Sequence, residues 1–296
     1  MDRLIGVFLV TLSAILFGTN PIFARISYDS GANPGTYLFI RFLIASPVMF
    51  MIMIARGYAI PRGKLLVTLI LIGGISAGTT FCFYTALHFA PVNLIIVITY
   101  MYPTIVTLLS AVFLKQPITG FKIVALIMTV VGILFAIGID SGGYVLGMIL
   151  AMVAAIFQSL FLIFGSLSIQ NAGPFPATTI IILSSAVIYG IYVSAQGLQL
   201  PMNISGWFAI TTSALFSTSL GLITFFAGLK RIDTANASII STFEVVVTVV
   251  LAILILGETL SLLKILGACL VILAVVILAK SEYKTAQVKI SHSISQ

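Results

Sequence analysis

Residues 83–123 read FYTALHFAPVNLIIVITYMYPTIVTLLSAVFLKQPITGFKI, and residues 225–265 read FFAGLKRIDTANASIISTFEVVVTVVLAILILGETLSLLKI. The two stretches align without a gap, and a second match, one residue off that register, joins residues 6–27 to residues 147–168. Apolar identities are common in so hydrophobic a chain, so the paired lysines, Lys122 and Lys264, carry more weight than the rest. The chain therefore contains one unit twice.

Composition identifies the medium in which each unit folds. Hydrophobic residues make up 60% of the chain, and its 7% of charged residues are about a quarter of what a soluble domain carries. Crossing a hydrocarbon core of about 30 Å takes roughly 20 apolar residues. Ten stretches are long enough, at residues 4–24, 36–55, 65–87, 92–114, 121–139, 143–167, 175–197, 205–229, 234–256 and 261–279. We therefore predict an all-α integral membrane protein with ten transmembrane helices.

Each copy of the unit holds an odd number of predicted spans, so the two copies cross the bilayer in opposite senses. The resulting architecture is two inverted five-helix repeats, with a first module at residues 4–139, a second at residues 143–279 and a polar cytoplasmic tail at residues 280–296. Many secondary transporters use inverted repeats to build a midplane site that opens alternately to each side. The repeat therefore favours transport.

Basic residues predict the orientation. With the N-terminus in the cytoplasm, 11 Lys and Arg residues fall on the inner side and 3 on the outer side, which is a strong positive-inside bias. The outer three are Arg25, Arg41 and Lys264. We predict that both termini are cytoplasmic. The net charge of +7 then serves topology and contact with anionic lipid, and we expect no nucleic-acid partner.

Glu244 is an acid near the middle of its predicted span, about 15 Å from either end at 1.5 Å per residue. An ionised acid at that depth costs roughly 2.5–3.5 kcal/mol on insertion scales, and the alternative is that it stays protonated. In either state it faces the interior of the bundle. It is a candidate for substrate recognition or proton coupling, while the structural alternative is a neutral acid bonded to a carbonyl or a hydroxyl.

Two further residues are candidates for coupling or gating. Arg41 lies about one and a half turns into its predicted span. It either snorkels to the outer interface, or it guards the outer mouth or binds a carboxylate through both arms of its guanidinium. Pro103 lies inside a span, where a proline frees a backbone carbonyl and bends the helix. A kink that serves packing alone is the alternative for Pro103.

Other polar side chains within the spans outline a candidate substrate-binding cavity. In the repeat alignment Tyr102 is the counterpart of Glu244, so both copies direct a polar group from the same place. This pairing favours a midplane site over scattered polar residues. For a single hydroxyl, a hydrogen bond between helices is the alternative to contact with substrate. The candidate binding residues are Asn20, Thr80, Tyr84, Tyr102, Gln158, Ser219 and Glu244.

Several motifs are absent from the sequence. It contains no G-x-x-x-x-G-K-[ST] stretch, so the chain is not an ATP-driven pump by itself. It also lacks the H-E-x-x-H stretch of a metalloprotease. Its two cysteines, Cys82 and Cys269, lie within predicted spans, where core packing explains them. We predict no enzyme activity, no cofactor and no metal.

The chain resembles the EamA-type members of the drug/metabolite transporter superfamily over nearly its whole length. The resemblance is carried by Phe17-Gly18-Thr19-Asn20, by Arg41-Phe42, and by Glu244-Val245 followed by Leu256-Gly257-Glu258-Thr259-Leu260-Ser261. The family typically has a proline after the acid of the ninth helix. Here Val245 occupies that place, although the first module keeps Pro103. The departure leaves the kink of the ninth helix open and does not affect the fold.

The resemblance implies a ten-helix transporter with a central cavity between two modules, in the bacterial inner membrane. Such proteins move small metabolites, frequently outward, so we expect export of a small polar or amphipathic metabolite, with amino acids as the leading class. Its partners would be that substrate, membrane lipids and, in a coupled mechanism, protons; no oligomeric state is predicted. An uncoupled facilitator in which Glu244 is structural is the main alternative. A non-transporting membrane protein or a lipid-modifying enzyme is the remote one.

Overall fold

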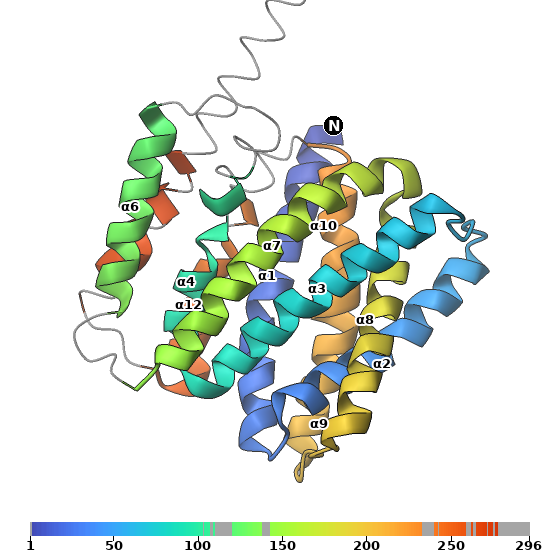
Figure 1. Cartoon of the computed structure of the whole chain (residues 1–296), viewed down its shortest axis with the longest axis horizontal. Helices are drawn as coiled ribbons and strands as arrows, with labels where there is room; N and C mark the ends of the chain where they lie inside the picture. Colours follow the sequence, from blue (N-terminus) through green and yellow to red (C-terminus); the bar gives the residue numbers. More distant parts are fainter. Residues whose placement is uncertain are drawn as a thin grey trace, which may run out of the picture.

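The computed structural model of the chain describes residues 2–102, 104–106, 109, 120–137, 143–232, 240–241, 243–258, 262, 265–270, 272–274 and 276–277. Within these ranges every regular element is a helix (Figure 1). The first half contains α1 (Asp2–Asp29), α2 (Pro34–Ala55), α3 (Lys64–Phe89), α4 (Val92–Thr99) and α6 (Gly120–Ile137). The second half contains α7 (Val145–Ala172), α8 (Pro174–Gln196), α9 (Ile204–Thr212), the π-helix η1 (Ser213–Leu220), α10 (Gly221–Leu229) and α12 (Phe243–Leu256).

Six helices in the described part of the chain are long and apolar enough to cross a membrane. They are Leu4–Asp29, Pro34–Ala55, Lys64–Phe89, Val145–Gly165, Pro174–Gln196 and Ile204–Leu229, and each overlaps one predicted span. Shorter apolar helices occupy Val92–Val106, Phe243–Leu256 and Ile265–Ala274. These findings agree with a helical membrane protein, and the count of ten stays a prediction. Pro103, Lys264 and the tail at 280–296 lie outside the described residues.

The first connection is shorter than the apolar pattern suggests. We expect the first span to end at Ala24, but α1 continues to Asp29, and Gly31 follows with a φ of 97°. A positive φ suits glycine, which has no Cβ. Asn33 then caps α2, because its side chain accepts a hydrogen bond from the Thr36 backbone N–H at 2.8 Å. Arg25 therefore lies on a helix, one turn before the end of α1.

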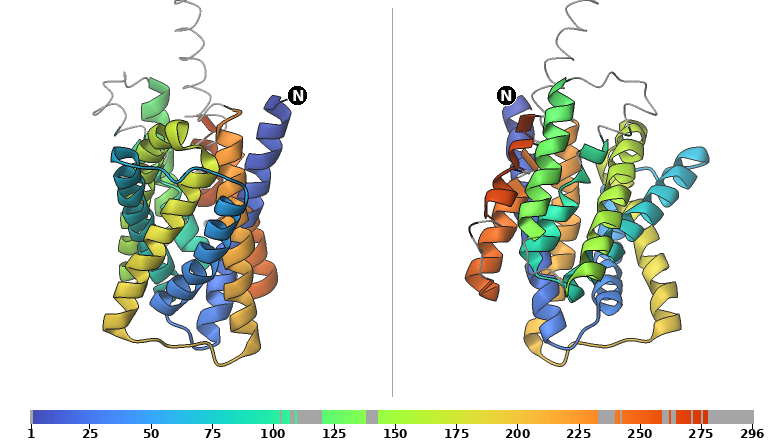
Figure 2. Two further views of the ribbon diagram at one scale, coloured as in Figure 1. Left: turned by 90° about the vertical axis from the view of Figure 1, so that its right-hand side faces the viewer. Right: turned by 60° about the vertical axis from the view of Figure 1, so that its left-hand side comes forward.

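The two halves of the chain are interleaved (Figures 1 and 2). From the first half, α1 packs against η1, α10 and α12, while from the second half α7 packs against α3 and α4. Helices α2 and α8 pack against each other. In the repeat alignment the packing of α1 on α10 corresponds to that of α7 on α3, and the contact between α2 and α8 corresponds to itself. In Figure 1, α1 runs downward from the N-terminus, whereas α7 runs upward from the lower left.

Gly18 allows the closest approach of α1 to α12. A Cβ at this glycine would lie 2.8 Å from the Val247 side chain and 3.1 Å from the Glu244 carbonyl oxygen. At the same place the Thr248 hydroxyl donates to the Gly18 carbonyl oxygen at 3.1 Å. Small residues allow such approaches between membrane helices, where lipid provides no hydrophobic drive for association. The position of Glu244 therefore depends on the absence of a side chain on α1.

Candidate functional site

The central feature of the molecule is a cavity of about 180 Å³ between the two halves of the chain. Its walls come from α1, α2, α3, α4, α7, η1, α10 and α12. Seven of the predicted site residues line it: Asn20, Arg41, Thr80, Tyr84, Tyr102, Gln158 and Glu244. The structure thus brings together side chains that lie as far apart in the sequence as Asn20 and Glu244. Their contact with a substrate stays a prediction.

Ser219 is the described candidate that does not line the cavity. Its hydroxyl is buried within η1 and donates to the Ala214 carbonyl oxygen at 2.8 Å, five residues back. The neighbouring Thr218 lines the cavity instead. The reason is the π-helical register of η1, since a π-turn holds more residues than an α-turn and rotates the following side chains. An apolar pattern alone does not reveal that change of register.

Glu244 lies in the first turn of α12 and is half-buried, with its exposed surface on the cavity. The Tyr100 hydroxyl donates to Glu244 Oε2 at 2.8 Å, and it also lies 3.0 Å from the Ser241 carbonyl oxygen. The Tyr100 ring in turn packs at 5.4 Å from the ring of Tyr102. Glu244, in the second module, is thus held by Tyr100 of the first module. Tyr100 lies two residues before Tyr102, the repeat counterpart of Glu244.

Arg41 is buried, with an exposed fraction of 2%. The prediction that it snorkels to the interface is therefore wrong, because snorkelling keeps the charged head in water. Its guanidinium carbon instead lies 5.4 Å from the ring centre of Tyr37, 4.8 Å from that of Phe42 and 4.5 Å from that of Tyr84. Aromatic faces attract a cation at these distances. Guanidinium nitrogens Nε and Nη1 have no hydrogen-bond partner.

A hydrogen-bonded group on the wall joins three helices near Arg41. The Ser213 hydroxyl donates to Asn20 Oδ1 at 2.7 Å, and the Tyr37 hydroxyl lies 2.7 Å from that of Ser213. The bonds connect α1, η1 and α2. Asn20 therefore both forms a hydrogen bond between helices and lines the cavity. Neither Tyr37 nor Ser213 was selected from the sequence, because isolated hydroxyls in apolar spans have no distinguishing pattern.

A second such group joins α3 to α8. The Thr80 and Tyr189 hydroxyls lie 2.6 Å apart, and Tyr189 donates to the Ala77 carbonyl oxygen at 2.6 Å. The Tyr189 ring also stacks on Phe42 at 5.5 Å, beside Arg41. Buried hydroxyls are normally hydrogen-bonded, so these contacts explain Thr80 without a ligand. Thr99, Thr218 and Ser241 differ, because they line the cavity with hydroxyls that have no partner.

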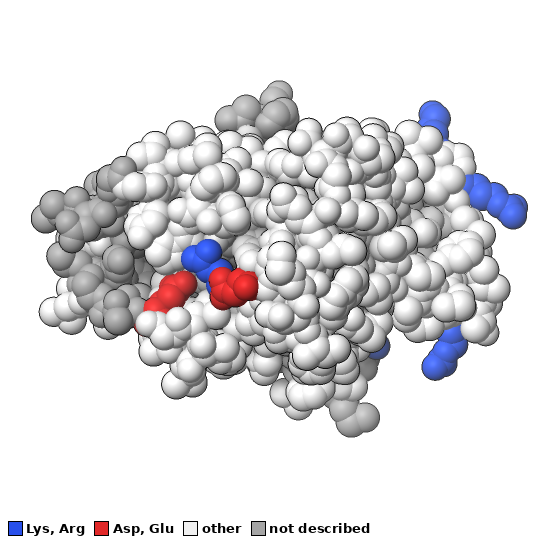
Figure 3. All heavy atoms as spheres, turned by 90° about the horizontal axis from the view of Figure 1, so that it is seen from below, with Lys and Arg blue, Asp and Glu red and all other residues white. Residues whose placement is uncertain are grey.

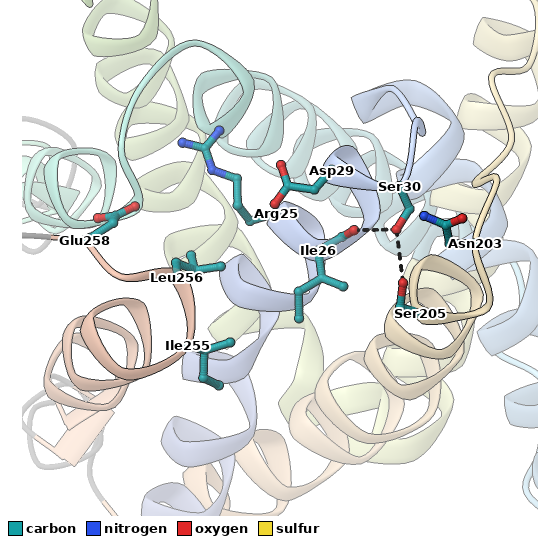
Figure 4. A pocket seen from close by; sticks show the side chains of 9 residues that line it. All are labelled: Arg25, Ile26, Asp29, Ser30, Asn203, Ser205, Ile255, Leu256 and Glu258. Atoms are coloured by element: carbon teal, nitrogen blue, oxygen red, sulfur yellow. Dashed lines mark hydrogen bonds between the residues drawn. The ribbon is translucent and has the colours of Figure 1, made fainter.

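A second, open hollow of about 500 Å³ lies at the end of the molecule where α1 ends and α9 begins (Figure 4). Its charged lining residues are Arg25, Asp29 and Glu258. Viewed from below, acidic and basic side chains gather on a face that is otherwise largely uncharged (Figure 3). Nearby, the Ser30 and Ser205 hydroxyls lie 3.4 Å apart, and the Met202 backbone N–H donates to the Ser30 carbonyl oxygen at 2.7 Å.

The same face holds the junction between α3 and α4. Arg25 donates to the Leu87 carbonyl oxygen at 2.7 Å and to the Ala90 carbonyl oxygen at 3.2 Å, at the end of α3. Glu258 accepts from the backbone N–H groups of Val92 at 2.8 Å and Asn93 at 3.1 Å, at the start of α4. A carboxylate is favourable at a helix N-terminus, where N–H groups have no partner within the helix. Charges on α1 and after α12 thus hold both sides of the junction.

Apolar helices long enough to span a bilayer, together with a cavity between them that is lined by polar and charged side chains as well as apolar ones, define an integral membrane protein built around an internal site. The sequence profile of the EamA-like transporter family matches residues 4–138 and 145–280. The chain therefore belongs to the EamA-like transporter family, as two tandem copies of its repeat. Family membership and the names of its relatives indicate a membrane transporter.

Relatives with assigned names are similarly described. A protein of Clostridium kluyveri named "Uncharacterized transporter" is 23% identical and the match covers 96% of each chain. "Uncharacterized transporter YyaM" of Bacillus subtilis is 23% identical over 92% of each chain. An Archaeoglobus fulgidus "Uncharacterized transporter" is 27% identical, and the match spans 61% of this chain and 65% of that protein. A crystal structure at 21% identity superposes with a TM-score of 0.69 and covers 92% of this chain, which shows the shared fold.

Proposed function

We propose that this protein is a secondary transporter that exports a small polar or amphipathic metabolite across the bacterial inner membrane, with amino acids as the leading class of substrate. The observation that carries the proposal is a cavity, lined from both halves of the chain, whose walls include a buried arginine and a carboxyl group. Its volume of about 180 Å³ is below the roughly 300–1,000 Å³ typical of sites for drug-sized ligands. That size favours a metabolite over a large drug.

Alternating access between modules 4–139 and 143–279 is the mechanism that we propose, within a ten-helix inverted repeat. In support of this mechanism, α1 of the first half packs on α10 and α12 of the second half, and α7 of the second half packs on α3 and α4 of the first. Rocking of one module against the other around a central site is how such repeats work in other transporters. With both termini cytoplasmic, the hollow beside Arg25 and Glu258 faces outward, and the α3–α4 junction belongs to the outer closure.

Glu244 is the proposed point of proton coupling. It is the acid among the residues that line the cavity, and its contact with Tyr100 joins it to the other module. Binding of a substrate ammonium and binding of a proton would compete for the same carboxylate, which is the exchange that a proton-driven exporter requires. In the alternative, an uncoupled facilitator, the Tyr100 contact serves structure alone.

The test is transport by the purified protein in proteoliposomes, with a panel of labelled amino acids, amines and nucleosides. Uptake is measured with and without an imposed pH gradient, for the wild type and for Glu244→Gln. We expect the gradient to drive accumulation of one class of substrate, and Glu244→Gln to abolish that drive while exchange at equal pH continues. Asp29→Asn is the matched control, because it removes an acid from an exposed position at the end of α1.

Two other outcomes would decide against parts of the proposal. Flux that ignores the gradient and is unchanged in Glu244→Gln would make the protein a facilitator with a structural acid. Flux of nucleosides or amines alone would keep the transporter and remove amino acids as its substrate class.

A further inference from the structure

Arg41 is a buried cation that the described protein does not neutralise. Its exposed fraction is 2%, and its Nε and Nη1 atoms have no hydrogen-bond partner. In the described part of the chain, no carboxylate lies within ion-pair distance of it. A buried charge is normally paired, because the surroundings replace its lost hydration poorly. The three aromatic rings around it attract the charge through their faces, which leaves Nε and Nη1 without a hydrogen-bond partner.

The unpaired donors belong to a residue that lines the central cavity, but Nε and Nη1 are themselves buried, so an acceptor in the cavity reaches them only when the side chains around Arg41 move aside. A guanidinium presents its N–H groups as a planar fork, which matches the two oxygens of a carboxylate. Tyr84 packs against Arg41 with its ring 4.5 Å away, and this side chain also lines the cavity. The geometry therefore favours a small anionic group on the part of the cavity wall that contains Arg41 and Tyr84.

The opposite charge of the cavity lies on a different helix. Glu244 comes from α12 and is held by Tyr100 of the first module, whereas Arg41 comes from α2 and is held among aromatic rings. No ion pair joins the two residues, and Tyr84, whose ring centre lies 4.5 Å from the Arg41 guanidinium carbon, lines the same cavity as both. A ligand in this cavity thus meets one lining residue with a cation and another with a carboxyl group. Thr99, Thr218 and Ser241 also line the cavity, and their buried hydroxyls have no hydrogen-bond partner.

We infer that Arg41 binds the carboxylate of a zwitterionic α-amino acid whose ammonium group faces Glu244. The inference rests on the proposed transport function and adds to it the group that each charge recognises. The free carboxylate is then the main determinant of selection, since without it the guanidinium stays buried and unpaired in the complex. A substrate that lacks the carboxylate is rejected for that reason, as a site built for a polar group rejects analogues that lack it.

The test compares amino acids with analogues that lack one charge. Alanine, leucine and phenylalanine are each matched with the amine that lacks the carboxylate, the acid that lacks the ammonium, and the primary amide. Binding to the detergent-solubilised protein is measured by calorimetry, and flux in proteoliposomes by counterflow. We expect at least one amino acid to bind tenfold or more tightly than its amine and its amide. Arg41→Gln should abolish that preference while leaving the weak binding of the amine.

Arg56→Gln is the matched control, because it removes an arginine from the exposed C-terminal end of the same helix. Arg41→Lys is the second variant, which keeps the charge but loses the planar fork, and an intermediate preference is expected for it. Elution as a single species in size-exclusion chromatography, together with retained amine binding, shows that each variant is folded.

The outcomes separate this inference from the transport function. An amine or amide that binds as tightly as its amino acid, a preference that survives Arg41→Gln, or no binding by any amino acid would overturn the inference. Counterflow of an amine without its amino acid would keep the transporter and overturn the role of Arg41. Arg41-dependent binding without any flux would keep the carboxylate site and overturn the transport function.

Discussion

Glu258 shows how one residue of a sequence motif acquires a structural role. It ends the Leu256-Gly257-Glu258 stretch, where Gly257 has a φ of 66°. That positive φ ends α12 and turns the chain, so that the Glu258 carboxylate meets the first two N–H groups of α4. The carboxylate supplies two acceptors to donors that the helix leaves free.

We predict that Glu258→Gln loosens the start of α4. A glutamine offers a single acceptor oxygen, so one of the two N–H groups loses its partner. The expected loss of stability is about 1–2 kcal/mol, between that of a helix-dipole contact and that of a charge-assisted hydrogen bond. Hydrogen–deuterium exchange of a peptide that contains Val92 and Asn93 should accelerate, and the melting temperature in detergent should fall. Asp29→Asn is the control; equal exchange in both variants would contradict the role given to Glu258.

At the scale of the helices, the packing of α1 on α12 decides where the acid of the cavity lies. The contact needs a glycine at position 18, because a Cβ there would lie 2.8 Å from the Val247 side chain. Thr248 adds a hydrogen bond from α12 to the backbone of α1 at the same place. A shift of α12 away from α1 would therefore carry Glu244 with it.

We predict that Gly18→Ala reduces both stability and transport. Overpacking of this kind costs about 1–3 kcal/mol, and the displaced Glu244 should lower pH-driven flux more than exchange at equal pH. Gly74→Ala is the matched control, since a Cβ on that glycine of α3 meets only the Ile188 side chain, at 3.9 Å. In the control, alanine should be neutral or slightly stabilising, because it restricts the unfolded chain. Similar melting temperatures for the two variants would show that α1 and α12 tolerate the separation.

At the scale of the whole molecule, the proposed alternating-access cycle requires the end of the molecule beside Arg25 to open. The end of α1 meets the start of α9 there, with the Ser30 and Ser205 hydroxyls 3.4 Å apart and the Met202 N–H bonded to Ser30. Alternating access requires these contacts to separate once in every cycle.

We predict that a disulfide between the two positions stops transport. Ser30→Cys and Ser205→Cys are combined in a chain whose own cysteines, Cys82 and Cys269, are replaced by alanine. Oxidation should abolish most counterflow, and a reductant should restore it. Each single cysteine variant is the control for the effect of the oxidant. Full flux with the disulfide formed in all molecules would mean that this end stays closed during transport.

Much of the fold could be predicted because the bilayer constrains it strongly. Runs of apolar residues must form helices, since backbone groups find no partner in lipid, and each of the six long apolar helices overlaps a predicted span. The duplication could be read from the alignment of the two stretches, and the family profile matches both halves. Helix ends were less predictable, because α1 continues past the apolar run to Asp29, and Arg25 in this extension bonds to the end of α3.

The candidate site was predicted in composition but not in arrangement. Polar residues within apolar spans are rare and must face the interior, so Asn20, Arg41, Thr80 and Glu244 could be selected and do line the cavity. Ser219 was selected on the same grounds and lies within η1, because a π-turn changes which side chains face inward. Tyr37, Tyr189 and Ser213 were missed, since their role comes from contacts between helices far apart in the sequence.

The sequence by itself determined that this is a duplicated helical membrane protein of the EamA type, because hydrophobic length and repeat are local properties of a chain in lipid. The burial of Arg41, the contact of Tyr100 with Glu244 and the clamp on the α3–α4 junction were decided by the tertiary structure alone. These depend on which helices meet and on how each is rotated about its axis. Close packing at glycines such as Gly18 sets that rotation. The packing thereby brings together residues whose positions in the sequence follow no regular spacing.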